Sequence, residues 1–458
     1  MQGLVAAVIG LTLMAEPPDG APPPLAPEQT EAFYAERDGW PVWLDEAGPL
    51  PAAERLLHAV KAVDSHGLDP SHYHVGALAA SWRQLESLSR DKLLRDPLAL
   101  ARFDRLYTDA FLRLAGDLRH GRLAYADTPH PRWNHPEPGP DPVELLGSTL
   151  PEGDPWQALA EQAPREEAYY RLRGALQDYR TIRDEKKAAG EEVNHSLQKQ
   201  IDRLRVNLER HRWLPRTEAE RAMRIEITDF TLRQYEAGEV VATQPVVVGR
   251  PHRQTPNLSH RLMSMVFNPR WEVPHTIAVR DLLPRFREDP AQVVERNFTV
   301  YRPPDEEGYE EEVDPADVDW EVEPARFNYR LSQGPHATNP MGRVKFQFPN
   351  RYFVNLHDTP DRHLFATDYR AYSAGCVRLR DPLQLAEWLL EPHEEEVHVE
   401  ALIGEGEEEI ELRLEHPPPI HILYRTAWVD EEGAIQYRDD IYQRDERLLE
   451  RLRVGPGG

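Results

Sequence analysis

From residue 223 to residue 249 the chain reads MRIEITDFTLRQYEAGEVVATQPVVVG, in which apolar and polar residues largely alternate. Alternation with a period of two is the pattern of a β-strand that buries one face. The EAG at 236–238 is a turn signal between two such strands. Strand-like segments recur at 263–269, 343–349, 352–357 and 396–402. The second half of the chain is therefore predicted to be mainly β.

The region before these strands has a helical period instead. Apolar residues recur three and four positions apart within 50–63, 103–118, 166–187 and 196–213. Pro215 ends the last of these segments, because proline cannot continue a helix. We therefore expect an α+β multidomain protein, with a helical scaffold domain at 28–216 and a mainly-β domain at 222–402.

Two further segments interrupt or follow the predicted strands. Residues 275–338 contain a helix-like stretch, LLPRFREDPAQVVER, and the acidic run DEEGYEEEVDPADVDWEVE. A run of this length between strands is more than a connection requires, so we interpret it as an inserted lid. The alternative for the acidic run is a solvated surface without a function. Residues 403–458 form a C-terminal hairpin and tail, in which 420–429 is expected to pair with 435–442 and to pack back onto the scaffold.

Composition excludes several classes of partner. The 458 residues include 54 Lys and Arg against 79 Asp and Glu, which gives a formal net charge of −25. Nucleic acids and anionic membranes both attract basic surfaces, so neither is expected as a partner. A single cysteine, Cys376, excludes an intrachain disulfide and a cysteine-rich zinc site. No motif for a metal or a cofactor is visible, and none is expected.

The start of the chain resembles an export signal. Residues 4–15 read LVAAVIGLTLMA, and the chain then becomes polar and rich in proline at 16–27. A bilayer span needs ~20 apolar residues, whereas a secretory signal needs fewer. We predict a signal peptide at 1–15 and a Pro-rich linker at 16–27, although no basic residue precedes the apolar run. A disordered or docked apolar N-terminus is the alternative. No other apolar run is long enough to cross a membrane.

Residues that carry chemistry gather in NLHDTPDRHLFATDYRAYSAGCVRLRDP, residues 355–382. His357 ends a strand-like run and is the natural base or imidazolium partner for Cys376. Gly375 lets a substrate backbone approach the sulfur, and Arg378 places a cation near it, which favours the thiolate. Backbone N–H groups near Gly375 and Cys376 are candidates for stabilising an oxyanion. We interpret this set as a cysteine nucleophile, and an inert buried cysteine beside a satisfied histidine is the alternative.

The pattern HDTP…SAGCVRL resembles the active-site signature of the L,D-transpeptidases, which are cysteine enzymes that cross-link peptidoglycan. Further segments are similar to the large periplasmic members of that family, and the likeness covers most of the chain from about residue 30. These segments are 33–44, 206–215, 246–259, 266–278, 339–350 and 424–442. The resemblance identifies 222–402 as the catalytic domain, with the 275–338 insertion capping it.

The same resemblance assigns roles to the residues of the signature. Cys376 is implied to be the nucleophile and His357 the proton donor and acceptor. Arg378 is implied to supply electrostatic stabilisation of the thiolate or the substrate, and Gly375 an oxyanion-binding backbone. Many relatives have a second histidine where this chain has Ala374, so no catalytic role is assigned there.

Three more residues of this stretch, Ser373, Asp358 and Thr359, are expected to bind substrate. One departure from the large relatives concerns 180–199, which joins two predicted helices where those relatives usually carry a peptidoglycan-binding module. Twenty residues are too few for such a domain, so independent anchoring to the wall is in doubt.

The activity implied by the resemblance is acyl transfer between peptidoglycan stem peptides in the periplasm. The cysteine attacks a tetrapeptide stem, releases D-Ala and passes the acyl group to the amine of another stem's diamino acid. Carbapenem-type β-lactams are the implied inhibitors. Two alternatives use the same nucleophile with another acceptor, either water in a carboxypeptidase or the lysine of a lipoprotein. A non-catalytic wall-binding scaffold is the alternative from a different class.

Overall fold

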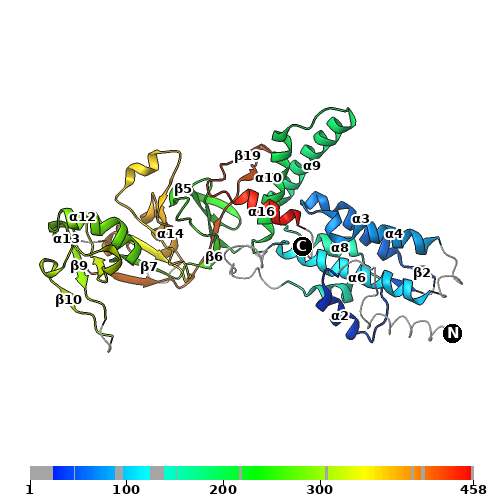
Figure 1. The fold of residues 1–458 in the computed structure, drawn as a ribbon, viewed down its shortest axis with the longest axis horizontal. Coiled ribbons are helices and arrows are strands. Elements are labelled where there is room, and N and C mark those ends of the chain that lie inside the picture. Colours follow the sequence, from blue (N-terminus) through cyan, green and yellow to red (C-terminus); the bar gives the residue numbers. More distant parts are fainter. Residues whose placement is uncertain are drawn as a thin grey trace. The chain divides into compact units, whose positions relative to one another are not determined.

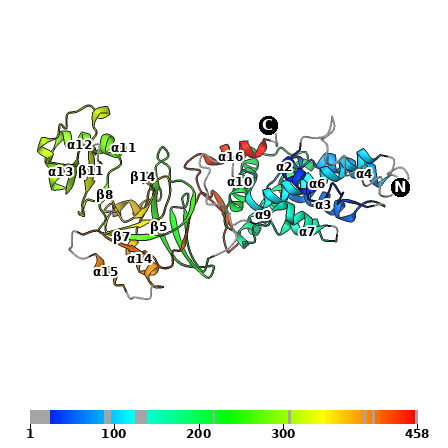
Figure 2. The ribbon, with the colours of Figure 1, turned by 90° about the horizontal axis from the view of Figure 1, so that it is seen from below.

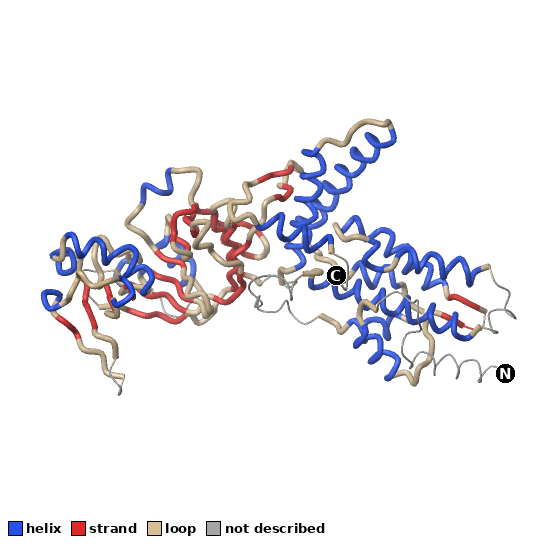
Figure 3. The backbone as a smooth tube through the Cα atoms, viewed as in Figure 1, coloured by secondary structure: helices blue, strands red, loops and turns tan. Residues whose placement is uncertain are grey.

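The computed structural model describes residues 24–45, 47–87, 96–123, 139–150, 152–215, 219–304, 308–392, 397–403 and 408–454. The chain divides into two compact units, one made of Met1–Thr217 with Arg425–Gly458 and the other of Glu218–Tyr424. Figure 3 shows that helices dominate the first unit and that most strands belong to the second. The predicted signal peptide at 1–15 and most of the 16–27 linker lie outside the described residues.

The first unit is helical (Figure 1), and proline begins many of its helices. A proline in the first turn sacrifices no hydrogen bond, because the first N–H groups of a helix have no partner within it. Asp96, Asp141 and Asp154 accept from N–H groups of the helices that follow them. The α-helices are α2 (Pro27–Ala35), α3 (Pro51–Ala62), α4 (Val75–Glu86), α6 (Pro97–His120), α7 (Pro142–Thr149), α8 (Pro155–Ala160), α9 (Glu167–Ala188), α10 (His195–Arg212) and α16 (Arg444–Arg453).

The four helices predicted from periodicity correspond to α3, α6, α9 and α10. Between them lie two short 3-10 helices and a small antiparallel pair, which are η1 (Val63–His66), η2 (Pro70–Tyr73), β1 (Leu44–Asp45) and β2 (Gly48–Pro49). None of the helices in the described ranges has both the length and the hydrophobicity that a membrane span requires.

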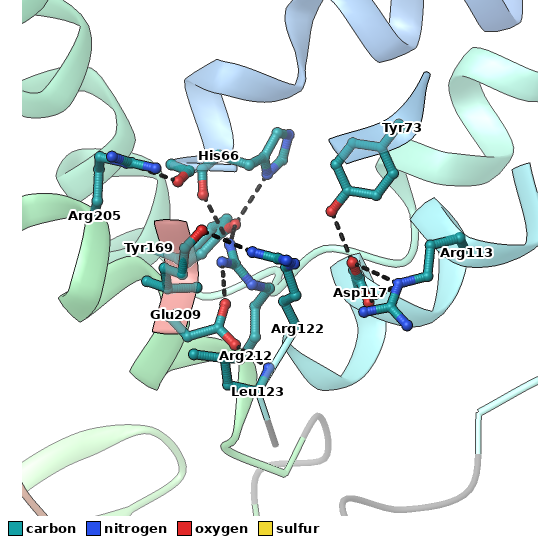
Figure 4. A network of polar contacts seen from close by, with 12 residues as sticks. His66, Tyr73, Arg113, Asp117, Arg122, Leu123, Tyr169, Arg205, Glu209 and Arg212 are labelled. Atoms are coloured by element: carbon teal, nitrogen blue, oxygen red, sulfur yellow. Dashed lines mark hydrogen bonds and ion pairs between the residues drawn. The ribbon is translucent and has the colours of Figure 1, made fainter. Parts of the chain in front are cut away.

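A buried polar network fixes the C-terminal end of α10 (Figure 4). Arg212 and Glu209 form a fully buried ion pair of 2.5 Å. Arg212 also donates to the Tyr169 hydroxyl at 3.0 Å and to the His66 carbonyl at 2.8 Å, and Glu209 accepts from the Leu123 N–H at 2.9 Å. A buried charge is tolerated only when it is paired and hydrogen-bonded, so this network ties α9, η1 and the end of α6 to α10.

The C-terminal segment closes the first unit. β18 (Ala427–Val429) and β19 (Ile435–Tyr437) form an antiparallel hairpin whose Ala427 and Val429 belong to the helical core. Leu448 and Leu452 of α16 pack in a second cluster with Leu123, Val206 and Trp213.

The hairpin differs from the prediction in one strand. Residues 420–429 were expected to form a single strand, but β17 (Pro419–Leu423) lies between β3 (Arg221–Glu226) and β6 (Leu258–Arg261) in the second unit. Thr426 separates the two strands, since its N–H and hydroxyl bind Asn207 of α10 instead of a strand. The sheet of the second unit consequently continues beyond residue 402, where we expected that domain to end.

The second unit contains an eleven-stranded sheet with the order β16-β7-β12-β13-β15-β5-β4-β3-β17-β6, and β14 pairs with β5 beside this path. β3, β4 (Thr231–Glu236) and β5 (Glu239–Gly249) are the meander predicted at 223–249. The remaining strands are β7 (Ser264–Phe267), β12 (Val344–Gln347), β13 (Leu356–His357), β14 (Ala371–Ser373), β15 (Val377–Leu379) and β16 (Ile410–Arg413). The helices are η6 (Arg362–Ala366), α14 (Pro382–Leu390) and α15 (Val399–Leu402).

One predicted strand is wrong, because 396–402 contains α15. Four apolar residues in seven positions suit one helical turn as well as a short strand, so the pattern could not discriminate. The edge of the sheet beside β7 is occupied by β16.

A subdomain is inserted between β7 and β12 and stands beside the larger sheet (Figures 1 and 2). Its four-stranded antiparallel sheet has the order β10-β9-β11-β8. Its elements are β8 (Trp271–Glu272), α11 (His275–Ile277), the π-helical η3 (Ala278–Leu282), α12 (Leu283–Glu288), α13 (Ala291–Glu295), β9 (Phe298–Tyr301), β10 (Glu312–Val313), η4 (Pro315–Asp317), η5 (Pro324–Arg326) and β11 (Arg330–Gln333).

The inserted subdomain has a hydrophobic core of its own around Phe286 and Phe298. Within the acidic run, Val313, Val318 and Trp320 are buried in this core. The run is therefore not only a solvated surface, because these apolar residues are part of the packing.

A single buried amide joins the two connections of the insertion. Asn339 Nδ2 donates to the carbonyl of Pro269 at 2.9 Å, before the insertion, and to that of Gly334 at 3.1 Å, after it. Its Oδ1 accepts from the Met341 N–H at 2.8 Å. The insertion thus leaves and rejoins the larger sheet at neighbouring points.

Candidate active site

Two short parallel strands bring the predicted site residues together. β13 and β15 pair with Leu356 opposite Val377 and His357 opposite Arg378. Paired residues of adjacent strands project to the same face, and residues two apart on a strand do so as well. His357, Arg378 and Cys376 therefore share one face of the sheet, although nineteen residues of chain separate His357 from Cys376.

His357 is buried and has a defined tautomer. Its Nδ1 lies 2.6 Å from the carbonyl oxygen of Asp358. A carbonyl can only accept, so the ring proton is on Nδ1 and Nε2 keeps its lone pair. Burial lowers the pKa of His357 to about 3, and the charges of Arg378 and Lys345 act in the same direction. The imidazole is consequently neutral, oriented and able to accept a proton.

Cys376 is half-buried and directly precedes β15. Burial raises the pKa of its thiol above the ordinary value, although the Asn355 N–H and the charges of Arg378 and Lys345 oppose this shift. The charge of Arg378 by itself lowers the pKa of the thiol and so favours the thiolate, which is the direction that we expected. Desolvation is the larger effect, however, so the resting sulfur is a thiol.

The turn that carries the nucleophile is braced from within. Ser373 Oγ accepts from the Gly375 N–H at 3.0 Å and donates to the Cys376 carbonyl at 2.5 Å. Thr255 Oγ1 donates to the Gly375 carbonyl at 2.8 Å and accepts from the Gly249 N–H at 2.8 Å. Gly375 has φ +126°, which other residues rarely adopt, so a side chain there would strain the turn.

These contacts change the expected source of an oxyanion-binding group. The N–H of Gly375 is already engaged by Ser373, so it is not available to a substrate. In the part of the chain that the structure describes, no group accepts from the N–H of Cys376. The backbone of Cys376 is therefore the better candidate.

The residues expected to bind substrate are buried. Asp358 accepts from the Arg343 N–H at 2.9 Å and forms an ion pair with Arg362. Thr359 Oγ1 accepts from the Asp361 N–H at 3.2 Å. Like Ser373, these side chains are hydrogen-bonded within the unit, and their placement does not support direct contact with a substrate.

Arg378 is half-buried, and the nitrogens of its guanidinium group have different surroundings. Its Nη1 binds Asp361 Oδ2 at 2.7 Å. Its Nε is buried and has no hydrogen-bond partner among the described residues. Part of the positive charge is thus compensated by Asp361, and one donor remains available.

The structure adds residues that sequence reasoning missed. Asn350 accepts from the Tyr352 and Val354 N–H groups at 3.1 and 3.0 Å, and so shapes the loop before β13. In that loop Phe353 is 86% exposed, has φ +53°, and its carbonyl oxygen lies 3.9 Å from the Cys376 sulfur. The sequence signal for this loop was weak, because Phe353 lies within the strand-like segment 352–357 and Asn350 lies just before it.

Comparisons with known proteins agree with this division of the chain. A model of the Scaffold domain matches residues 28–176, and a model of the L,D-transpeptidase catalytic domain matches residues 220–400. A curated protein of Haemophilus influenzae, which carries the provisional name L,D-transpeptidase, is 28% identical over 417 residues. That alignment covers 91% of this chain and 78% of the relative.

Solved structures align over less of the chain. An L,D-transpeptidase from Mycobacterium smegmatis aligns at 16% identity with a TM-score of 0.23, over 45% of this chain and 59% of that one. L,D-transpeptidase 3 from Mycobacterium tuberculosis, in complex with a faropenem-derived adduct, aligns at 11% identity with a TM-score of 0.21, over 44% of this chain and 60% of that one. The chain thus spans less than two thirds of each of these structures.

Proposed function

Because the chain joins an L,D-transpeptidase catalytic domain to an N-terminal Scaffold domain, we propose that it cross-links peptidoglycan by acyl transfer through Cys376. The donor is a tetrapeptide stem whose third residue is a diamino acid and whose last residue is D-Ala. The acceptor is the side-chain amine of the third residue in another stem. The reaction takes place in the periplasm, to which the apolar segment 4–15 directs the chain.

In the first half-reaction the resting pair is a neutral thiol and a neutral imidazole. His357 Nε2 takes the thiol proton while the sulfur attacks the carbonyl carbon of the donor's third residue. The Cys376 N–H donates to the oxyanion that forms. The C–N bond to D-Ala then breaks, the imidazolium returns the proton to the leaving amine, and a thioester remains. The His357–Asp358 hydrogen bond supports this step, because it keeps Nε2 free as the base.

In the second half-reaction the same groups act in reverse. His357 Nε2 removes a proton from the acceptor amine as its nitrogen attacks the thioester carbon. The C–S bond breaks, and the proton returns to the sulfur. The product is an amide between two third residues, and the enzyme regains its starting state.

The observation that carries this proposal is a neutral, oriented His357 on the same sheet face as the only cysteine of the chain. Intact-mass spectrometry after incubation with a carbapenem tests it, and a covalent adduct on Cys376 is expected. Cys376→Ala should form no adduct, should remain folded and should lose turnover by orders of magnitude. Residual activity of this variant within tenfold of the wild type would remove Cys376 from the mechanism.

The products that the enzyme forms from a tetrapeptide donor identify the acceptor. A cross-linked dimer together with released D-Ala is expected from a transpeptidase. Free tripeptide as the main product would instead assign water as the acceptor, and the protein would be a carboxypeptidase.

The inserted subdomain is proposed to act as a lid over the donor. Arg253 lies in the loop beside the nucleophile turn, where its carbonyl oxygen would be 3.9 Å from a Cβ added to Gly375. The same residue forms an ion pair with Asp281 of the insertion at 3.5 Å. A lid that excludes water prolongs the life of the thioester until an amine arrives.

A further inference from the structure

A second cation lies on the catalytic face of the sheet, on the other side of His357 from Arg378. Lys345 of β12 pairs with His357 of β13, which in turn pairs with Arg378 of β15. The three residues therefore form one row across adjacent strands and project to the same face. Adjacent strands are ~4.8 Å apart, so the backbone of Lys345 is about that far from the backbone of His357.

The two cations differ in what they bind. Arg378 is paired with Asp361 at 2.7 Å. Lys345 is half-buried, and across the described ranges its side chain makes neither a hydrogen bond nor an ion pair. Glu411 shares its row, but it lies two strands away on β16, beyond Val266. In a chain with a formal net charge of −25, an uncompensated ammonium at this position requires an explanation.

The charge of Lys345 reaches the reacting groups. It lowers the pKa of both the Cys376 thiol and the His357 imidazole. Because Lys345 is one strand from His357 and two strands from β15, which directly follows Cys376, an anion bound to Lys345 would lie beside the groups that react in the proposed mechanism.

We propose that Lys345 binds the terminal carboxylate of the donor stem. In the proposed reaction this carboxylate belongs to the leaving D-Ala and is two bonds away from the nitrogen of the scissile amide. A stem that is one residue longer has an uncharged amide at the same place, so Lys345 selects donors that end directly after the scissile bond. This inference rests on the proposed function and specifies its substrate class.

The test compares a tetrapeptide donor with its C-terminal amide, and kcat/KM is measured for release of D-Ala or its amide. The wild type should prefer the free acid by about tenfold or more, the size of a hydrogen bond between charged groups. Lys345→Met should lose this preference by becoming slower on the acid alone, while Lys345→Arg should retain most of it. Arg413→Met, which removes an exposed cation of the edge strand β16, is the matched control and should leave the preference unchanged.

A third donor distinguishes the terminal carboxylate from the others on the stem. This donor keeps its terminal carboxylate, while every other carboxylate is amidated. The wild type should still prefer it over the donor with a terminal amide, and Lys345→Met should show no such preference. Equal rates of the wild type on acid and amide would overturn the inference, as would an undiminished preference in Lys345→Met. Urea unfolding with the midpoint of the wild type shows that each variant is folded. If the wild type releases neither product, the proposed function itself fails, and this inference with it.

Discussion

At the scale of single residues, Cys376 and His357 are both neutral, because burial outweighs the nearby cations at the thiol and acts together with them at the imidazole. Burial raises the pKa of the thiol and lowers that of the imidazole to about 3. A stable thiolate–imidazolium pair would require the opposite shifts. The proton of the thiol is therefore transferred only when a substrate is attacked, and His357 must be the base.

This charge state predicts how iodoacetamide labelling of Cys376 depends on pH. The thiolate is the reactive form, and a raised pKa means that its population increases only toward alkaline pH. The labelling rate should rise continuously between pH 6 and pH 9 by about tenfold per pH unit. Mass spectrometry of quenched samples measures the rate. A plateau of fast labelling that already begins near pH 5 would indicate a preformed ion pair and contradict the neutral state.

His357→Gln should slow both half-reactions, because one imidazole serves first as base and acid and then again as base. General acid–base catalysis typically contributes ~10²–10⁴-fold, so a loss of that order is expected in each step. Single-turnover experiments separate formation of the thioester from its transfer to the amine. His363→Gln, on the exposed segment η6 nearby, is the matched control. If His363→Gln were the slower variant, our choice of base would be wrong.

At the scale of elements, the site depends on loops that hydrogen bonds hold in place. The nucleophile turn is braced by Ser373 and Thr255, and the loop before β13 is held by Asn350. The strands beneath are short, since β13 comprises only Leu356–His357. Sheet pairing alone therefore does not fix the position of the sulfur.

Thr255→Val tests the brace at nearly constant volume. Valine can bind neither the Gly249 N–H nor the Gly375 carbonyl, so the free energy of unfolding should fall by about 1–3 kcal/mol. Acylation of Cys376 by a carbapenem should slow as well, because the turn loses a support. Urea unfolding and stopped-flow fluorescence provide the two measurements. Thr255→Ser keeps the hydroxyl and should resemble the wild type in both, and a defect equal to that of valine would contradict the hydrogen-bond explanation.

The long amphipathic helices and the β3–β5 meander could be predicted because their periodicity extends over many residues. The short elements could not, as α15 shows, because four residues do not define a period. The assignment of β17 to the sheet depends on its partners β3 and β6, which no local pattern reveals. The same limit explains why Cys376 and His357 were found as a motif while Thr255, more than a hundred positions earlier in the chain, was missed.

At the scale of the whole molecule, the chain has two compact units. The helical unit gains its C-terminal hairpin and α16 from the end of the chain, so the second unit is an insertion between two parts of the first. The second unit in turn contains the inserted subdomain with its own core. Each level of insertion can be tested separately.

Replacing residues 275–333 with a short Gly/Ser linker should raise hydrolysis of the thioester relative to cross-linking. It should also weaken binding of the donor, because the proposed lid is lost while Asn339 and the larger sheet remain. Chromatography of the products gives the ratio, and fluorescence titration gives the affinity. Asp281→Asn, which removes only the ion pair with Arg253, should show a smaller effect of the same sign. A folded deletion variant with an unchanged ratio and affinity would leave the insertion without a role in catalysis.

The buried amide of Asn339 has a consequence for how such a protein diversifies. Because one side chain binds Pro269 and Gly334 together, the two junctions of the insertion are close in space, and a new segment between them imposes little closure entropy on the sheet. Recombination can therefore exchange the inserted subdomain without disturbing the strands beside Cys376 and His357. Chimeras that graft foreign segments between these junctions should keep the fold of the larger sheet.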